Sequence, residues 1–265
     1  MTVKIYILTD MEGISGISRR EMVMPDEGGD HYQYGRKCLT EDINAAVAGA
    51  FDGGATEVVV NDGHGGGRHL ILEDADARAI YERPVSAVDI CPSLDESFAG
   101  MLMVGAHAMA GTLNGFLDHT QSSMSWYNYY LNGEKHGEIG ECAAWAGHYG
   151  VPMLMVAGDQ AACDEAKRLY GTPVTVAVKT GRGREHAILI HPKKAREMIR
   201  EGAKEAMSWI GKQEPWVLEK PITVRLELYR SDMADGMANS DRITRIDART
   251  VEMTVNSQIE IMKWS

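Results

Sequence analysis

Four short apolar segments along the chain each end in polar residues. They cover residues 3–8, 57–60, 101–104 and 153–156, and valine, isoleucine, leucine and methionine dominate them. Continuous apolar runs of this length are typical of strands in a parallel sheet that is covered on both faces. The pattern therefore predicts four buried strands.

Helical patterns separate these strands. Between Ile43 and Phe51 apolar residues recur at helical spacing, with Thr40 as the predicted N-cap and glycines 53 and 54 as the end. Further helices are predicted over residues 138–149, 164–170 and 192–209, the last with a proline at its first position. Alternating strands and helices predict right-handed βαβ units. The expected fold class is α/β, with a mostly parallel sheet and helices on both faces.

The pattern changes after Lys212. Residues 222–228 and 250–255 are rich in β-forming side chains, and no long helix is predicted between them. We therefore predict an α/β catalytic domain over residues 1–212 and a smaller C-terminal β-containing region over residues 213–265. The last residues follow a helical pattern from about Ser257, and the chain stops within it. One open interpretation is that the C-terminal region is truncated.

The composition of the chain limits the cell compartments and the binding partners that we expect. The chain has 265 residues and a net charge of −11, and this acidic balance disfavours a nucleic-acid partner. It has no apolar run near the ~20 residues that span a bilayer and no pattern of a secretory signal, so we expect a cytoplasmic protein without a membrane partner. The four cysteines form no C-x-x-C pair and are predicted to be buried free thiols: Cys38, Cys91, Cys142 and Cys163.

Polar side chains that can bind metal ions follow three of the predicted strands. Asp10 and Glu12 follow the first strand, His64 follows the second, and His107 follows the third. Ligands of open α/β sheets bind beyond the carboxyl ends of the strands, so these side chains are expected to converge on one crevice. Two carboxylates and two imidazoles suit zinc, manganese or iron. Residues two apart in an extended chain point to the same side, so both carboxylates can reach one site.

Each of these residues also has an interpretation that needs no metal. Asp10 and Glu12 fit a solvated turn, and His107 fits a hydrogen-bonded histidine of the core. The glycines after His64, in NDGHGGGR, could bind a phosphate through backbone N–H groups, although they match neither a dinucleotide-binding pattern nor a P-loop. Repetition at successive strand ends favours a metal site over separate accidents.

Five stretches of the chain carry a more specific pattern. They read TDMEGISG over residues 9–16, VNDGH over 60–64, GAHA over 105–108, GEIG over 137–140 and VPMLMVAGD over 151–159. Together they resemble the D-aminopeptidases of the DppA type, which are dinuclear zinc peptidases. The resemblance runs in order from residue 3 to about residue 195 and continues more loosely beyond it.

This resemblance implies a role for each matching residue. Asp10 corresponds to the carboxylate that bridges two metal ions. Glu12 and His64 correspond to further ligands of the first ion, and His107 and Glu138 to those of the second. The helical pattern alone does not separate Glu138 from Glu141, and only the GEIG match selects Glu138.

His119, in the sequence LDHT, corresponds to a histidine that acts directly in catalysis. The chain departs from the family pattern around residues 112–117, where it carries one extra residue. We expect His119 to lie near the metals without being a ligand, on a loop that follows the strand ending at His107.

The implied activity is that of a zinc metallo-aminopeptidase. It would hold two Zn²⁺ per subunit, or other divalent metals, and hydrolyse N-terminal residues from short peptides, D-alanine peptides in particular. The resemblance also implies a ring-like homo-oligomer, a decamer. Two other classes stay open: a metal-dependent phosphohydrolase, and a non-catalytic protein of this fold that binds a small ligand. All five ligand positions are filled, which favours the enzyme.

Overall fold

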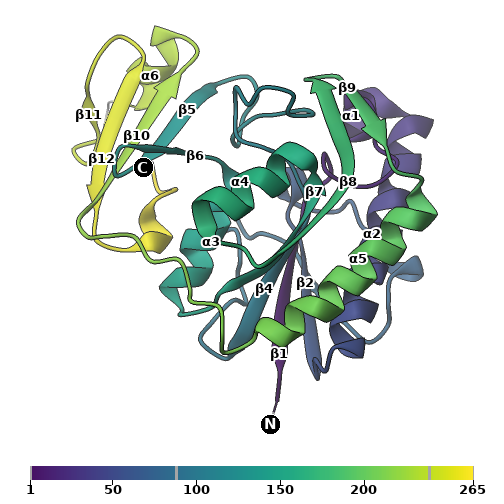
Figure 1. The fold of residues 1–265 in the computed structure, drawn as a ribbon. Coiled ribbons are helices and arrows are strands. Elements are labelled where there is room, and N and C mark those ends of the chain that lie inside the picture. Colours follow the sequence, from purple (N-terminus) through teal and green to yellow (C-terminus); the bar gives the residue numbers. More distant parts are fainter. Residues whose placement is uncertain (1, 87–88, 238–239, 265) are drawn as a thin grey trace.

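The computed structural model describes residues 2–86, 89–237 and 240–264. Within them a seven-stranded sheet forms the centre of the molecule, in the spatial order β3-β2-β1-β4-β7-β8-β9 (Figure 1). Its strands are β1 (Lys4–Thr9), β2 (Glu57–Asp62), β3 (Ile80–Glu82), β4 (Phe98–Ala106), β7 (Met153–Asp159), β8 (Val174–Gly183) and β9 (His186–Leu189). Neighbouring strands are parallel except β8 and β9, which are antiparallel. The predicted fold class is confirmed.

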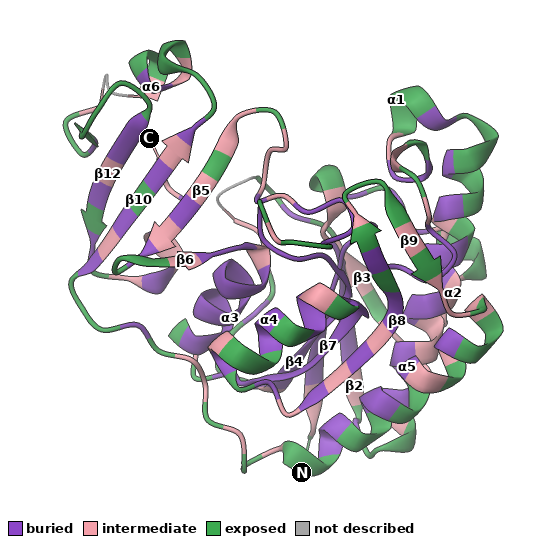
Figure 2. Cartoon of the chain, turned by 45° about the horizontal axis from the view of Figure 1, so that its top comes forward, coloured by how far each residue is buried: buried purple, intermediate pink, exposed green. Residues whose placement is uncertain are grey.

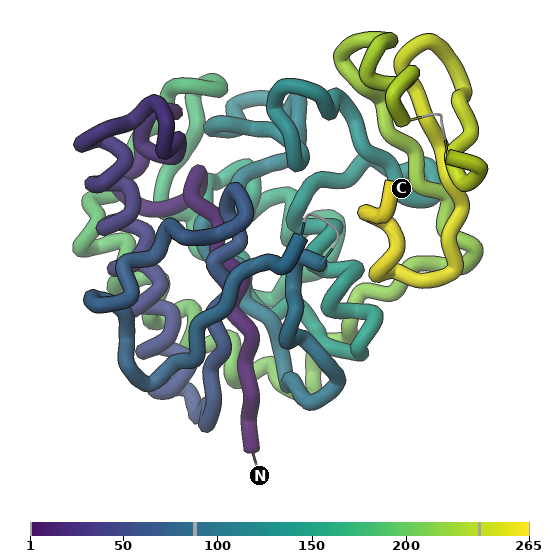
Figure 3. Tube along the Cα trace, turned by 180° about the vertical axis from the view of Figure 1, so that it is seen from behind, coloured from purple at the N-terminus to yellow at the C-terminus, as the bar shows by residue number. Residues whose placement is uncertain are grey.

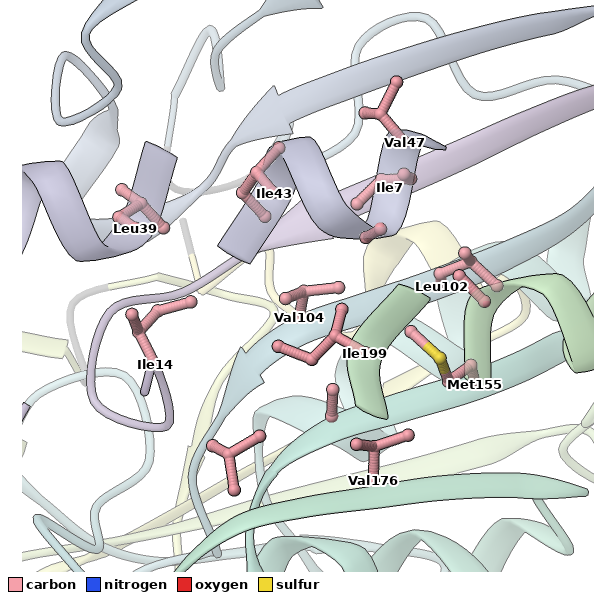
Figure 4. Packing of buried hydrophobic residues seen from close by; sticks show 14 of the residues in the cluster. Ile7, Ile14, Leu39, Ile43, Val47, Leu102, Val104, Met155, Val176 and Ile199 are labelled. Atoms are coloured by element: carbon pink, nitrogen blue, oxygen red, sulfur yellow. The ribbon is translucent and has the colours of Figure 1, made fainter. Parts of the chain in front are cut away.

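Two pairs of helices cover the two faces of this sheet. Helices α2 (Asp30–Asp52) and α5 (Pro192–Ala206) pack on one face, and α3 (Glu138–His148) and α4 (Gln160–Tyr170) pack on the other. Side chains of β1 alternate between the faces: Ile5 and Ile7 belong to the first core, and Tyr6 and Leu8 to the second. Figure 4 shows the first core, where Ile43 of α2 and Ile199 of α5 lie over the strands.

Helix α2 begins eleven residues before the predicted start. Its N-cap is Gly29, so the prediction of Thr40 as the N-cap was wrong. The Thr40 hydroxyl instead donates a hydrogen bond to the carbonyl of Arg36, one helical turn earlier. A threonine that satisfies its hydroxyl in this way is tolerated inside a helix, and sequence pattern alone does not distinguish it from a cap.

A second, antiparallel sheet stands beside the first, and buried and more exposed residues follow one another along its strands (Figure 2). Its order is β11-β12-β10-β5-β6, with β11 (Thr244–Arg245), β12 (Thr250–Val255), β10 (Ile222–Leu228), β5 (Trp126–Leu131) and β6 (Glu134–His136). Strand β5 pairs with β10, so the middle of the chain joins the C-terminal part, as the view from behind also shows (Figure 3). The division into domains at residues 212–213 stays a prediction, and the two sheets do not divide there.

The remaining regular elements are short. They are α1 (Pro25–Gly28), α6 (Ser231–Met237) and 3₁₀ turns at Arg20–Met22, His64–Gly66, Leu72–Asp74, Met207–Trp209 and Gln258–Glu260. The helix expected from Ser257 is therefore only one 3₁₀ turn. None of the helices in the described part of the chain is both long and apolar enough for a bilayer crossing.

The order of the strands fixes where a ligand can bind. From β1 the chain builds β2 and β3 on one side and then returns to build β4 on the other side. This reversal opens a crevice beyond the carboxyl ends of β1 and β4. Asp10 follows β1 and His107 follows β4, so both lie at the crevice.

Gly105 allows the two strand ends to approach one another. Its φ is +92°, and a Cβ at this position would lie 1.9 Å from the carbonyl oxygen of Asp10. Gly105→Ala should therefore lower the free energy of unfolding by more than the ~1–3 kcal/mol that left-handed strain alone costs. Urea denaturation of the metal-free protein measures this. Gly236→Ala is the control, since a Cβ there meets nothing within 4 Å; equal unfolding midpoints for both variants would contradict the interpretation.

Candidate metal centre

The strand ends bring the predicted ligands together in the crevice. Asp10 and Glu12 leave β1, His64 opens the 3₁₀ turn after β2, and His107 follows β4. Glu138 is the first residue of α3 and comes from a different direction. Asp10, Glu12 and His107 are at most 6% exposed. Buried charged groups of this kind require partners of opposite charge.

The two oxygens of the Asp10 carboxylate face different histidines. Oδ1 lies 2.9 Å from Nδ1 of His64, and Oδ2 lies 3.1 Å from Nε2 of His107. A second carboxylate stands beside each histidine: Glu12 Oε2 is 3.2 Å from His64 Nδ1, and Glu138 Oε1 is 3.3 Å from His107 Nε2. Asp10 is therefore shared between two groups, each completed by one further carboxylate and one imidazole.

Each histidine of the centre faces oxygen acceptors at both ring nitrogens. The nitrogens that point away from the carboxylates contact backbone carbonyls: His64 Nε2 at 3.0 Å from Val23, and His107 Nδ1 at 3.1 Å from Ala108. A neutral imidazole carries only one N–H. Once that N–H donates to the carbonyl, the other nitrogen turns a lone pair toward carboxylates. A proton or a metal ion is needed between them, and this is the usual orientation of a metal-binding histidine.

Buried polar atoms without hydrogen bonds mark the same place. Among the described residues, Asp10 Oδ2, Glu12 Oε2 and His107 Nε2 are buried without a hydrogen-bond partner. The ligand atoms of these three residues lie within 4.8 Å of one another, and so do those of His107, His119 and Glu138. Since an unsatisfied buried group costs free energy, the donor set fits divalent cations such as zinc.

The electrostatics of the metal-free centre favour charged pairs. Burial alone would lower the pKa of His64, but the charge of Glu12 and the contact with Asp10 raise it well above its usual value. Burial would also lower the pKa of His107, but Glu138 and Asp10 raise it well above its usual value. Metal ions must displace these protons, so metal affinity is expected to fall as the solution becomes acidic.

His119 lies beside the second group of ligands. Its ring stacks on that of His107, with centroids 4.0 Å apart and planes 10° apart. Nδ1 lies 2.8 Å from the carbonyl oxygen of Leu117, and Nε2 lies 3.7 Å from Oε1 of Glu138. The structure thus places His119 beside the candidate ligands His107 and Glu138, within reach of a ligand position. Its role as a non-ligand stays a prediction.

Glu138 and Glu141 have different surroundings although they share a helix. Glu138 faces His107, whereas Glu141 accepts a hydrogen bond of 2.7 Å from the side-chain amide of Gln121. Burial, together with the charge of Glu138, raises the pKa of Glu141 to about 8. Burial therefore favours the protonated form of Glu141.

These surroundings predict unequal effects of two matched substitutions. Glu138→Gln should weaken metal binding by more than the roughly 10–100-fold typical of a residue behind a ligand. Glu141→Gln should leave metal content unchanged, because an amide resembles the protonated carboxyl. Elemental analysis after dialysis against buffered zinc measures both. Metal loss confined to Glu141→Gln would reverse the assignment.

Two residues that support the centre were not predicted from the sequence. Lys179 is fully buried under the loop after β1, where its Nζ donates to the carbonyls of Glu12 and Ile17 at 2.6 and 2.8 Å. Asp159 accepts a hydrogen bond from the backbone N–H of Phe116 and so holds the loop that carries His119. Lys179 interrupts an apolar strand pattern, which was an available signal. In the sequence Asp159 is only the last residue of the stretch VPMLMVAGD.

A pocket of about 710 Å³ opens onto the centre. Asp10, Glu12, His64, His119 and Glu138 line one part of it. Its volume lies within the ~300–1,000 Å³ typical of small-molecule sites. Fold and site together define a metal-dependent hydrolase with room for a small substrate.

The chain belongs to the D-aminopeptidase family, whose family model matches residues 3–265. The resemblance seen in the sequence is therefore confirmed, and with it the class of metal-dependent aminopeptidases. A D-aminopeptidase of Bacillus subtilis (strain 168) is 37% identical over 217 residues, which are 80% of this chain and 77% of the relative.

A solved structure shares the whole architecture. It is the Zn-dependent D-aminopeptidase DppA from Bacillus subtilis, described as a self-compartmentalizing protease. The two structures superpose with a TM-score of 0.94 and 30% sequence identity, over 99% of this chain and 95% of that one. The second sheet belongs to this shared fold.

Proposed function

We propose that the protein is a D-aminopeptidase that uses two zinc ions to hydrolyse short peptides with an N-terminal D-residue. The observation that carries the proposal is the Asp10 carboxylate, whose two oxygens face two separate groups of ligands at 2.9 and 3.1 Å. The relatives named as D-aminopeptidases, one of them Zn-dependent, support the metal and the stereochemistry.

Five residues of the site would hold the metal ions, and His119 would transfer protons. Asp10 would bridge the ions, with Glu12 and His64 on one side and His107 and Glu138 on the other. When bound, the ions supply Lewis-acid polarisation of the scissile carbonyl and a water whose pKa is close to neutrality. His119, fixed through Nδ1 by the Leu117 carbonyl, turns Nε2 to the centre and can take a proton there and return it to the leaving amine.

The proposal is tested on purified protein loaded with zinc. Elemental analysis should give two equivalents of zinc per chain, and D-alanine p-nitroanilide should be cleaved faster than the L-enantiomer and faster than p-nitrophenyl phosphate. Treatment with a chelator followed by zinc should remove and restore the activity. A preference for the phosphate ester would instead support the phosphohydrolase, and metal binding without any hydrolysis would support a binding protein.

We also propose that the chain assembles into a ring-like homo-oligomer, a decamer. The support is the solved relative described as self-compartmentalizing, which matches nearly the full chain. Native mass spectrometry of the zinc-loaded protein measures the number of subunits. A monomer at micromolar concentration would contradict this.

A further inference from the structure

Three arginines line the pocket, and they differ in how their charges are used. Arg20 pairs with Glu27, and Arg184 pairs with Asp118 at 3.1 Å. Arg83 is exposed to the pocket, and among the described residues its guanidinium contacts the carbonyl of its neighbour Pro84, at 3.5 Å. Within the described part of the chain it has no carboxylate partner. One cationic side chain in this acidic protein is therefore free to bind an anion.

The neighbouring residues keep Arg83 in this state. Glu82 turns away from it, because the Glu82 carboxylate accepts hydrogen bonds from the Tyr6 hydroxyl, at 2.5 Å, and from Ser93. The base of Arg83 is held by the loop after β2, where a Cβ on Gly67 would lie 2.6 Å from the Cβ of Arg83. The side chain is thus fixed at its base, and its guanidinium forms no ion pair with any residue that the structure describes.

Arg83 lies at the same edge of the sheet as the metal centre, a short distance away from it. It directly follows β3, and the order β3-β2-β1 places it two strands away from the end of β1 that carries Asp10. Neighbouring strands lie ~4.8 Å apart, so this separation is about 10 Å. An extended peptide advances ~3.3–3.6 Å per residue, so two residues span about 7 Å and the length of the Arg83 side chain has to cover the remaining ~3 Å.

We propose that Arg83 binds the C-terminal carboxylate of the substrate and so restricts the enzyme to very short peptides with a free C-terminus. This rests on the proposed peptidase function. With the scissile bond at the metals, the carboxylate of a tripeptide lies two residues beyond that bond, about 7 Å along the path to β3, and the Arg83 side chain extends toward it. A guanidinium binds a carboxylate through two parallel N–H···O bonds, which favours an acid over an amide or a longer chain.

The test compares D-alanyl-D-alanyl-D-alanine with its C-terminal amide, using zinc-loaded protein. Arg83→Gln should raise KM for the acid by about tenfold to 100-fold, the range for hydrogen bonds to charged groups, with little change in kcat. Its KM for the amide should stay as in the wild type. Arg83→Lys should recover part of the loss. Arg20→Gln is the matched control, because it removes an arginine whose charge is already paired.

The outcomes separate this inference from the proposed function. Equal effects of Arg83→Gln on the acid and the amide, or no effect on either, would overturn the role of Arg83 and leave the peptidase intact. If the wild type cleaves neither peptide, the peptidase and the inference both fall. Thermal unfolding at the wild-type temperature shows that Arg83→Gln has kept its fold.

Discussion

Replacing Asp10 by alanine is expected to remove both metal ions and, with them, the activity. The reason is that one carboxylate serves both groups of ligands, through Oδ1 toward His64 and through Oδ2 toward His107. Enzymes typically accelerate reactions by ~10⁶-fold or more, so loss of the reactive centre should lower kcat/KM by at least about 10⁴-fold. Elemental analysis of the dialysed variant gives the metal content, and peptide hydrolysis gives the rate.

Two comparisons make this result specific to Asp10. Glu12→Ala removes a carboxylate from one group only and should spare part of the metal. Asp241→Ala, at an exposed position, should bind metal and cleave peptide as the wild type does. If Asp10→Ala kept one tightly bound ion and substantial activity, Asp10 would serve one metal and would not bridge.

Replacing His119 by alanine is expected to lower kcat by about 10²–10⁴-fold, the usual contribution of a general acid–base group. Both metals should stay bound and KM should change little. The Leu117 carbonyl fixes the ring at 2.8 Å, and the stacking on His107 directs its second nitrogen toward the reacting groups. Rates under single-turnover conditions, measured with the metal content of the same sample, test the expectation.

The alternative roles of His119 give different results. Loss of one metal would make His119 a ligand, which its place among ligand-capable side chains allows. Near wild-type kcat with both metals present would assign the residue to the structure of its loop. His186→Ala, at an exposed position, serves as the control for removal of an imidazole.

The strand ends were predictable because burial leaves a strong pattern. The predicted runs at residues 3–8, 57–60, 101–104 and 153–156 fall in β1, β2, β4 and β7, apart from Val3, which precedes β1. A parallel sheet then dictates that Asp10, His64 and His107 meet. Periodicity could not distinguish Glu138 from Glu141, since both lie on one helix. Their difference comes from His107 beside Glu138 and from the side-chain amide of Gln121 beside Glu141.

Other features depend on contacts that a linear pattern does not reveal. Strands β5 and β6 were not predicted, because β5 joins its sheet through β10, which is far away in sequence, and the three residues of β6 pair with β5. Arg83 follows a strand of three residues, too short to give a signal. Lys179 lies in an apolar run, and its two carbonyl acceptors are far away in sequence.

The pairing of β5 with β10 has a consequence for the order in which a newly made chain can fold. All five proposed ligands leave the ribosome before β10 is translated, so the metal centre can assemble early. Meanwhile Tyr129 and Leu131, which are buried in the finished second sheet, pair only with the short strand β6, and the edge of β5 that β10 later covers stays open. At ~5–20 residues per second this interval lasts on the order of ten seconds, and an unpaired apolar edge invites association between nascent chains. Yield during expression should therefore depend on chaperone supply more than the stability of the folded protein would suggest.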